Sequence, residues 1–294
     1  MHKSGFVNII GNPNVGKSTQ MNALVGEKLS IITSKAQTTR HRILGIVNGD
    51  DFQIVFSDTP GILKPCYKLQ ESMMNFVRGA LSDADVLLYV TDTVERDDER
   101  AAEIIDRIRQ SGVPTLVVVN KIDLTTQEAL EALVEKWRAT LPDAEIIPIS
   151  AREGFNIAGL FDRILALLPE GEPFYPKDTL TDKTLRFFAS EIIREKILRN
   201  YDKEIPYSCE IEIEEYREEP GIDRISAVIY VARNSQKGIL IGHKGEKLKK
   251  VGRQAREELE EFLRKKVFLQ LFVKVSEDWR NDQRQLRRFG YDPQ

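Results

Sequence analysis

The sequence predicts an α/β domain with a mostly parallel six-stranded sheet and one antiparallel edge strand, followed by an α+β domain. Short apolar segments alternate with amphipathic ones from residue 5 to about residue 168, which is typical of a parallel sheet covered by helices. A stretch rich in Pro, Gly and polar residues follows at 168–184, and the order of elements changes after it. We therefore expect domains at residues 1–170 and 183–294, joined by a linker at 171–182.

Six apolar runs account for the strands of the first domain. In order they are FVNII, RILGIV, FQIVFS, DVLLYVTD, TLVVVN and EIIPIS. Only a polar turn at 48–51 separates the second run from the third, so these two strands should form a hairpin. This hairpin adds the antiparallel edge to an otherwise parallel sheet.

The second domain is predicted to begin with a helix at 181–200. Strands at 208–216 and 225–233, helices at 235–241 and 246–265, and a strand at 267–276 follow. The first helix carries one apolar stripe, and CEIEIEEY alternates strictly, as a half-buried strand does. The stripe consists of Leu185, Phe188, Ala189, Ile192, Ile193 and Ile197. We expect the tail WRNDQRQLRRFGY to pack on this domain.

Charge and cysteine content restrict the class of protein only loosely. A formal net charge of -3 shows no global basic character, so a nucleic-acid surface would have to be a local patch. Cys66 and Cys209 lie far apart without metal-ligand spacing, which favours reduced thiols in a cytosolic protein. The N-terminus runs straight into a strand, and no apolar run approaches the roughly 18 residues of a membrane-spanning helix. We expect neither a signal peptide nor an integral membrane protein.

GNPNVGKS, at Gly11–Ser18, fits the phosphate-loop pattern GxxxxGK[ST] between a predicted strand and a predicted helix. Its glycines let backbone N–H groups turn toward phosphate oxygens, and the next helix adds its own N-terminal N–H groups. Lys17 is expected to reach the β- and γ-phosphates, and the Ser18 hydroxyl to bind Mg²⁺. The alternative is a chance match in an ordinary turn, which the flanking strand and helix argue against.

DTPG, at Asp58–Gly61, follows the third predicted strand. Ligands of open α/β sheets lie at the carboxyl ends of strands, so Asp58 can hold a water on the same Mg²⁺. Gly61 offers a backbone N–H that can approach a γ-phosphate without a side chain in the way. By itself DTPG could be an ordinary Pro-Gly turn.

NKID, at Asn120–Asp123, and SAREG, at Ser150–Gly154, follow the fifth and sixth predicted strands. The Asp123 carboxylate can accept two N–H donors from guanine, whereas adenine would leave the acid unpaired. Lys121 can lay its alkyl stem along the base or the loop, and backbone N–H groups of SAREG can meet the guanine carbonyl. Each motif is weak alone, but four in this order at strand ends indicate a guanine-nucleotide site.

Together these four motifs resemble those of the Ras-like translation-factor GTPases. The resemblance covers residues 5 to about 168 and implies a P-loop GTPase that binds GTP or GDP with Mg²⁺ and hydrolyses GTP to GDP and phosphate. It likens AQTTRHR to the first switch loop, whose threonine closes over Mg²⁺ and the γ-phosphate. We favour Thr39 for this role, with Thr38 as the alternative; either could instead be a solvated loop residue.

The residues expected to bind the nucleotide come from the four motifs. They are Gly11, Asn12, Pro13, Asn14, Val15, Gly16, Lys17, Ser18, Thr19, Asp58, Thr59, Pro60, Gly61, Ile62, Asn120, Lys121, Asp123, Ser150 and Ala151. Those expected to act in catalysis are Lys17, Thr39, Gly61 and Asn14. Mg²⁺ is expected at Ser18, Thr39 and Asp58.

Ile62 departs from the Ras-like pattern, because it stands where many such GTPases carry the glutamine that orients the attacking water. An alkyl chain cannot orient water, so we expect Ile62 to retract and intrinsic hydrolysis to be slow. Asn14 resembles an asparagine that, in related hydrophobic-substituted GTPases, helps hold K⁺ in the position of an arginine finger. The alternative is that Asn14 only adopts a left-handed turn.

GHKG, at Gly242–Gly245, lies between a short apolar helix and a long helix rich in Lys and Arg. Such a GxxG loop lets an RNA backbone approach closely and clamps about four nucleotides. The α-β-β-α-α-β order around it resembles a type II KH domain, which implies RNA binding. The expected RNA-binding residues are Gly242, His243, Lys244, Gly245, Lys247, Lys249, Lys250 and Arg253. The alternative for the basic residues is a solvated helix face.

The two domains in this order closely resemble the Era-type GTPases of bacterial ribosome assembly. The resemblance implies binding to the 3′ end of 16S rRNA on the small ribosomal subunit. It also implies a cytoplasmic protein, partly peripheral at the inner face of the cell membrane. We expect a monomer that binds no DNA and in which GTP and Mg²⁺ order the loops around Thr39 and Gly61 and so favour RNA binding. Two other functions stay open: an RNA-binding module with a structural nucleotide site, and a GTPase whose KH domain docks a protein.

Overall fold

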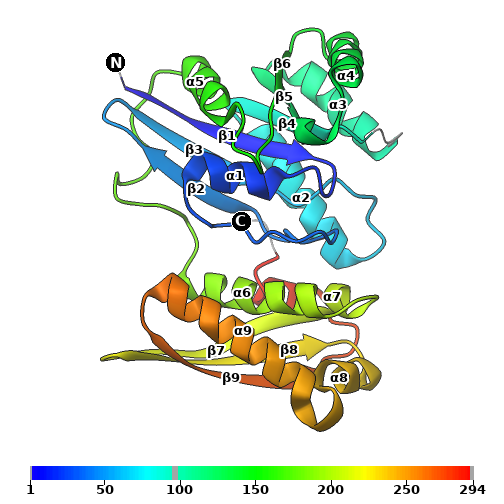
Figure 1. The fold of residues 1–294 in the computed structure, drawn as a ribbon, viewed down its shortest axis with the longest axis vertical. Coiled ribbons are helices and arrows are strands. Elements are labelled where there is room, and N and C mark those ends of the chain that lie inside the picture. Colours follow the sequence, from blue (N-terminus) through cyan, green and yellow to red (C-terminus); the bar gives the residue numbers. More distant parts are fainter. Residues whose placement is uncertain (1, 95–98, 292–294) are drawn as a thin grey trace. The chain divides into compact units, whose positions relative to one another are not determined.

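The computed structural model describes residues 2–94 and 99–291, which form two compact units. The first unit extends to Asp182 and the second begins at Lys183, apart from Tyr67–Leu69, which cluster with the second. Figure 1 shows that a sheet flanked by helices makes up the first unit, and that helices packed on a smaller sheet make up the second. Each unit has its own core.

The first unit contains the predicted six-stranded sheet. Its strands are β1 (Lys3–Gly11), β2 (Ile43–Asn48), β3 (Phe52–Asp58), β4 (Val86–Asp92), β5 (Thr115–Asn120) and β6 (Glu145–Pro148). The strand order is β2-β3-β1-β4-β5-β6, with only the β2–β3 pair antiparallel. The predicted fold class is therefore confirmed. Because β1 lies between β3 and β4, the loops that follow these three strands meet at one edge of the sheet.

Helices cover both faces of this sheet. They are α1 (Lys17–Val25), α2 (Lys68–Ser82), α3 (Glu99–Ser111), α4 (Gln127–Thr140) and α5 (Ile157–Leu167), with a 3₁₀ turn η1 (Ile122–Leu124). Apolar side chains of α2, α3 and α4 pack on one face, around Ile10, Tyr89 and Val117. The α1 and α5 helices contact each other, and α1 contacts β1, β2 and β3. Burial of both faces explains why the central strands are almost wholly apolar.

The segment at 171–182 runs along the first unit. The backbone N–H of Ile46 donates to the Leu180 carbonyl at 2.8 Å, on the outer side of β2, which is the edge strand of this sheet. The Gln53 side chain accepts from Tyr175 N–H at 3.0 Å and donates to the Tyr175 carbonyl at 2.8 Å. The Ile46 bond satisfies a backbone group of the edge strand β2 that would otherwise be open to another chain, and the Gln53 contacts hold the segment against β3.

The second unit has the α-β-β-α-α-β order of the predicted KH domain, with short additional helices. Its elements are α6 (Leu185–Asn200), α7 (Ile205–Ser208), β7 (Cys209–Glu219), β8 (Ile222–Val231), α8 (Asn234–Ile241), η2 (His243–Gly245), α9 (Glu246–Leu263), β9 (Lys266–Val275) and α10 (Gln283–Arg288). The β7 and β8 strands pair antiparallel, and β8 and β9 pair parallel. The α6 and α9 helices contact each other and pack on the same sheet.

The core of the second unit contains five of the six residues of the predicted α6 stripe, all but Leu185. Leu185 is 44% exposed, so it does not join the core with the rest of the predicted stripe. It is the first residue of α6, directly after the Thr184 cap. Side chains tilt toward the N-terminus of their helix, so that of the first residue points beyond the packed part of the helix.

The tail packs on the second unit, as expected. The Trp279 indole N–H donates to the Ser208 carbonyl at 3.0 Å, and the Tyr291 hydroxyl donates to Glu210 at 2.6 Å. The Trp279 and Tyr291 side chains are both buried. Among the helices of residues 2–94 and 99–291, none combines the length and the apolar character needed to cross a membrane.

Candidate functional site

The loop between β1 and α1 curls around its own lysine. Gly11 and Gly16 adopt positive φ values of 157° and 98°, and Asn14 a left-handed φ of 64°. The buried Lys17 ammonium donates to the carbonyls of Gly11 at 3.0 Å and Asn12 at 2.8 Å. The lysine therefore bridges the two ends of the loop that the sequence predicts to hold phosphates.

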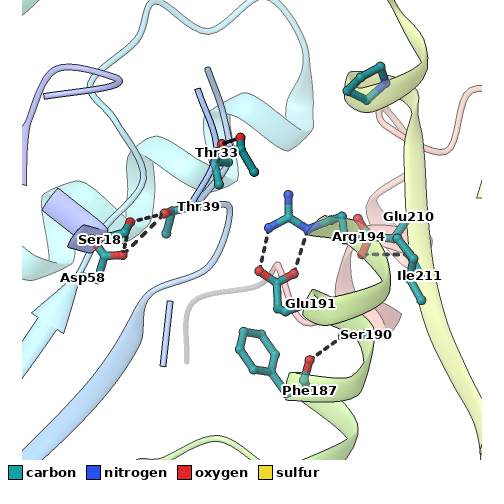
Figure 2. Close-up of polar contacts among 12 residues, drawn as sticks. Ser18, Thr33, Thr39, Asp58, Phe187, Ser190, Glu191, Arg194, Glu210 and Ile211 are labelled. Carbon is teal, nitrogen blue, oxygen red and sulfur yellow. Dashed lines mark hydrogen bonds and ion pairs between the residues drawn. The ribbon is translucent and has the colours of Figure 1, made fainter. Parts of the chain in front are cut away.

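Three oxygen-bearing side chains meet beside this loop. Figure 2 shows the hydroxyls of Ser18 and Thr39 turned toward the carboxylate of Asp58. Ser18 Oγ donates to Asp58 Oδ2 at 2.6 Å, and Thr39 Oγ1 lies 2.9 Å from Ser18 Oγ. The second carboxylate oxygen, Asp58 Oδ1, is buried without a hydrogen-bond partner among the residues that the structure describes. Hydroxyl and carboxylate oxygens are the ligands that Mg²⁺ prefers, so this cluster fits the ion.

The two switch threonines differ in their contacts. Thr39 is buried and its hydroxyl lies 3.4 Å from Asp58 Oδ2. The Thr38 hydroxyl instead donates to the Lys35 carbonyl at 2.6 Å and lies 2.6 Å from the Thr33 hydroxyl. In this conformation only Thr39 stands with Ser18 and Asp58.

Burial shifts both charged groups of the site toward their neutral forms. It raises the pKa of Asp58, an effect that the hydrogen bond from Ser18 opposes. It lowers the pKa of Lys17 to about 8, although the nearby Asp58 charge acts in the other direction. A cation beside Asp58 and an anion beside Lys17 would restore the charged forms. Oppositely shifted groups of this kind are typical of functional sites.

DTPG lies directly against the phosphate loop. A Cβ added at Gly61 would lie 2.8 Å from the Pro13 Cα, so only glycine permits this approach. The next residue, Ile62, donates its N–H to the Gly11 carbonyl at 3.1 Å. Its side chain is 1% exposed and packs in the core with Met74 and Tyr89. The Ile62 side chain is therefore directed into the core.

The motifs at the ends of β5 and β6 are joined to each other and to the phosphate loop. Asn120 donates to the Val15 carbonyl at 2.9 Å and accepts from Ala151 N–H at 2.9 Å. Ser150 donates to Asp123 Oδ1 at 2.6 Å, which orients an exposed carboxylate. The Asn120 amide thus ties together the segments that would hold phosphate and base.

Asp92, at the end of β4, was not singled out from the sequence. It is 3% exposed and forms an ion pair of 2.6 Å with Lys121, whose ammonium also donates to the Asn14 carbonyl at 2.6 Å. The Lys121 stem therefore runs along the loop. An acidic residue at the end of a strand next to β1 was the only signal in the sequence that could have identified Asp92.

A cavity of about 520 Å³ brings many of these residues together. Its lining includes Pro13, Asn14, Gly16, Lys17, Ser18, Thr19, Thr38, Thr39, Gly61 and Lys121. Asp58 and Asn120 lie outside this lining. Asp58 accepts a hydrogen bond from Ser18, which is part of the lining, and Asn120 donates one to the loop backbone. The lining also includes residues 31–34, which the sequence motifs did not identify.

The GxxG loop of the second unit joins α8 to α9. Gly242, Lys244 and Gly245 all have positive φ values, of 73°, 47° and 79°. The basic residues expected to face RNA are exposed: Lys244, Lys247, Lys249, Lys250 and Arg253. Within the described ranges none of these five forms an ion pair, whereas Arg256, farther along α9, pairs with Glu260 at 3.3 Å. The start of α9 therefore carries uncompensated positive charge, as a phosphate-binding surface requires.

Family models match both units. The model described as "50S ribosome-binding GTPase" matches residues 6–121, and that described as "KH domain" matches residues 204–280. The chain is 46% identical over 294 residues to GTPase Era of Syntrophus aciditrophicus strain SB, covering 99% of this chain and 96% of that relative. It is 45% identical over 293 residues to GTPase Era of Alkaliphilus metalliredigens strain QYMF, covering 99% of each.

Solved structures agree with these relatives. A variant of Aquifex aeolicus Era bound to GDP and AlF4⁻ superposes with a TM-score of 0.95 at 42% identity, covering 99% of this chain and 100% of that one. Era in complex with MgGDPNP and nucleotides 1506–1542 of 16S ribosomal RNA has the same TM-score and identity, and covers 100% of both chains. With such identity over nearly its whole length, the chain belongs to the Era family of GTPases.

Proposed function

We propose that this chain is a GTP-hydrolysing switch that binds the 3′ end of 16S rRNA through its KH domain and acts in assembly of the small ribosomal subunit. The carrying observation is the convergence of Lys17, Ser18 and Asp58 at one edge of the sheet, in a chain similar to an Era bound to MgGDPNP and 16S rRNA nucleotides. In this proposal the GTPase domain comprises residues 1–170, the linker residues 171–182 and the KH domain residues 183–294. The protein acts as a monomer in the cytoplasm, partly peripheral at the cell membrane.

Within the GTPase domain, each group has a separate task. The backbone N–H groups of the loop and the Lys17 ammonium hold the phosphates, and the Gly61 N–H meets the γ-phosphate. Ser18, Thr39 and Asp58 would hold Mg²⁺, directly or through water, and the ion supplies positive charge for the phosphate oxygens. Asp123, oriented by Ser150, accepts the N–H donors of guanine. These residues position and stabilise charge, which is most of what phosphoryl transfer requires.

Hydrolysis depends on a group other than Ile62 to assist the attacking water, and we assign this to K⁺ held by Asn14. The Asn14 Nδ2 donates to the Ser34 carbonyl at 3.2 Å, so Oδ1 is the side-chain atom available to a cation. We expect GTP hydrolysis to be at least about tenfold faster in KCl than in NaCl. Steady-state phosphate release in the two salts at equal ionic strength measures this ratio.

The control for the K⁺ effect is Asn14→Gly. Glycine keeps the left-handed φ of 64° and the backbone carbonyl that accepts from Lys121, and removes only the amide. The variant should hydrolyse GTP equally slowly in both salts. Equal rates for the wild-type protein, or an Asn14→Gly variant that keeps the potassium effect, would refute the assignment.

The switch requires that GTP and RNA favour the same state. We expect an RNA copying the 3′ end of 16S rRNA to bind at least about tenfold more tightly with a non-hydrolysable GTP analogue than with GDP, a coupling of about 1.4 kcal/mol. Fluorescence anisotropy of the labelled RNA gives both affinities, and sedimentation with separated ribosomal subunits tests the small subunit as target. Equal RNA affinities with the GTP analogue and with GDP would refute the coupling and would mean that the KH domain only tethers the GTPase to RNA.

A further inference from the structure

Tyr201 interacts with the two helices that flank the GxxG loop, although it is far from that loop in sequence. It caps the C-terminus of α6 and is 4% exposed. Its hydroxyl donates to the Leu240 carbonyl at 2.6 Å. Leu240 is the penultimate residue of α8, where carbonyls have no partner within their own helix. The tyrosine therefore ties the end of α6 to the end of α8, two residues before Gly242.

One face of the Tyr201 ring is turned toward the first turn of α9. The Lys247 ammonium lies 5.8 Å from the ring centroid. The Lys247 stem packs on Gly242, where an added Cβ would lie 2.8 Å from Lys247 Cγ. Tyr201, Lys247 and Gly242 thus form a packed unit, which we call the loop brace. It links α6, the end of α8 and the start of α9.

A brace is needed because the loop backbone is unusual. Gly242 has φ 73° and ψ 179°, a conformation open to glycine almost alone, and Lys244 adopts a left-handed φ of 47°. Inside the loop, Gly245 N–H donates to the Gly242 carbonyl at 3.2 Å. Such conformations persist only where the surroundings hold both ends. Burial also raises the pKa of Tyr201 to about 12, so its hydroxyl remains a donor.

We propose that Tyr201 is a positioning residue for RNA binding, which fixes the end of α8 and so orients the backbone N–H groups of the GxxG loop. It does this through Leu240 and Lys247 without touching RNA. The inference rests on the proposed RNA-binding function. Tyr201 lies outside the GxxG motif and outside the basic face of α9, at the end of a helix that the motif does not include.

Tyr201→Phe removes the hydroxyl and keeps the ring. We expect its affinity for an RNA copying the 3′ end of 16S rRNA to fall roughly two- to tenfold, as for loss of one buried hydrogen bond. The slope of log K against log salt should stay unchanged, because the phosphate-facing lysines remain. Lys249→Gln is the contrasting variant, and should reduce that slope by about 0.7. Hydrogen exchange of residues 242–247 should accelerate in RNA-free Tyr201→Phe.

Tyr216→Phe is the matched control. Tyr216 is on β7 of the same unit, outside the loop brace. The substitution removes a tyrosine hydroxyl that donates to Asp223 at 3.0 Å. This control should bind RNA like the wild-type protein. The inference is overturned if Tyr201→Phe binds RNA as the wild type does, or if both tyrosine variants lose affinity equally. If the wild-type protein does not bind the RNA at all, the proposed function fails instead, and loop exchange still shows whether the brace exists.

Discussion

Lys17→Ala should reduce GTP hydrolysis about a thousandfold, the scale of losing one preorganised charge from a phosphoryl-transfer site. The Lys17 ammonium is held by the carbonyls of Gly11 and Asn12 inside the phosphate loop. Among the described residues that line the cavity, Lys121 and Arg152 are the other cations; Lys121 is bound to Asp92, and the exposed Arg152 pairs with Glu153 at 3.6 Å. No neighbour can therefore replace Lys17. Single-turnover hydrolysis, with the protein in saturating excess over GTP, measures the loss in the chemical step.

The matched control for this change is Lys136→Ala, on the exposed surface of α4. It deletes the same side chain away from the cavity and should leave hydrolysis within about twofold of the wild type. Circular dichroism must show that Lys17→Ala is folded. A folded Lys17→Ala that retains more than a tenth of the wild-type rate would mean that the lysine is structural and that other groups stabilise the phosphates.

His243→Asp combined with Lys244→Asp should weaken RNA binding roughly a hundredfold, or about 2.7 kcal/mol. Both side chains are exposed at the tip of the GxxG loop, directly before the N-terminus of α9. The two aspartates remove one cation and place two negative charges where phosphates should lie. Because neither side chain packs in the core, the fold should persist. Anisotropy with the 16S rRNA 3′-end RNA measures the affinity.

A charge-matched control tests whether the loop itself is responsible. Lys266→Asp with Gln270→Asp makes the same change in net charge at two exposed positions of β9, in the same unit. This control should lose less than about threefold in affinity at moderate salt, because the length of α9, about 27 Å, separates Lys266 from the loop and exposed charges beyond a Debye length of about 10 Å are screened. Equal losses in both double variants would show that net charge, rather than the GxxG loop, governs RNA binding.

The sequence predicted the elements of the fold well because their signals are local. Apolar runs of strand length located all six strands of the first unit, and the turn at 48–51 identified the hairpin of β2 and β3. The helix at 181–200 was predicted to begin four residues early. Thr181 and Asp182 instead bond to Leu44 on β2, a distant partner that no local pattern reveals.

Residue type and spacing also predicted the chemistry of the site. A lysine, hydroxyls and a carboxylate at strand ends of an α/β sheet predict phosphate and Mg²⁺ binding from the sequence alone. The same reasoning favoured Thr39 but kept Thr38 as the alternative, because adjacent threonines of a loop have the same chemistry. Only the path of the chain separates them: it places Thr39 beside Ser18 and turns Thr38 toward Lys35.

The sequence by itself therefore determined the two fold classes, the nucleotide motifs and the GxxG loop, since each depends on residues close together in the chain. The tertiary structure alone decided which distant groups act on these motifs. It packed Ile62 with Met74 and Tyr89, paired Asp92 with Lys121, and bonded Tyr201 to the end of α8. The physical reason is that a motif records the chemistry of its own residues, whereas burial and side-chain pairing depend on the packing of segments that are distant in sequence.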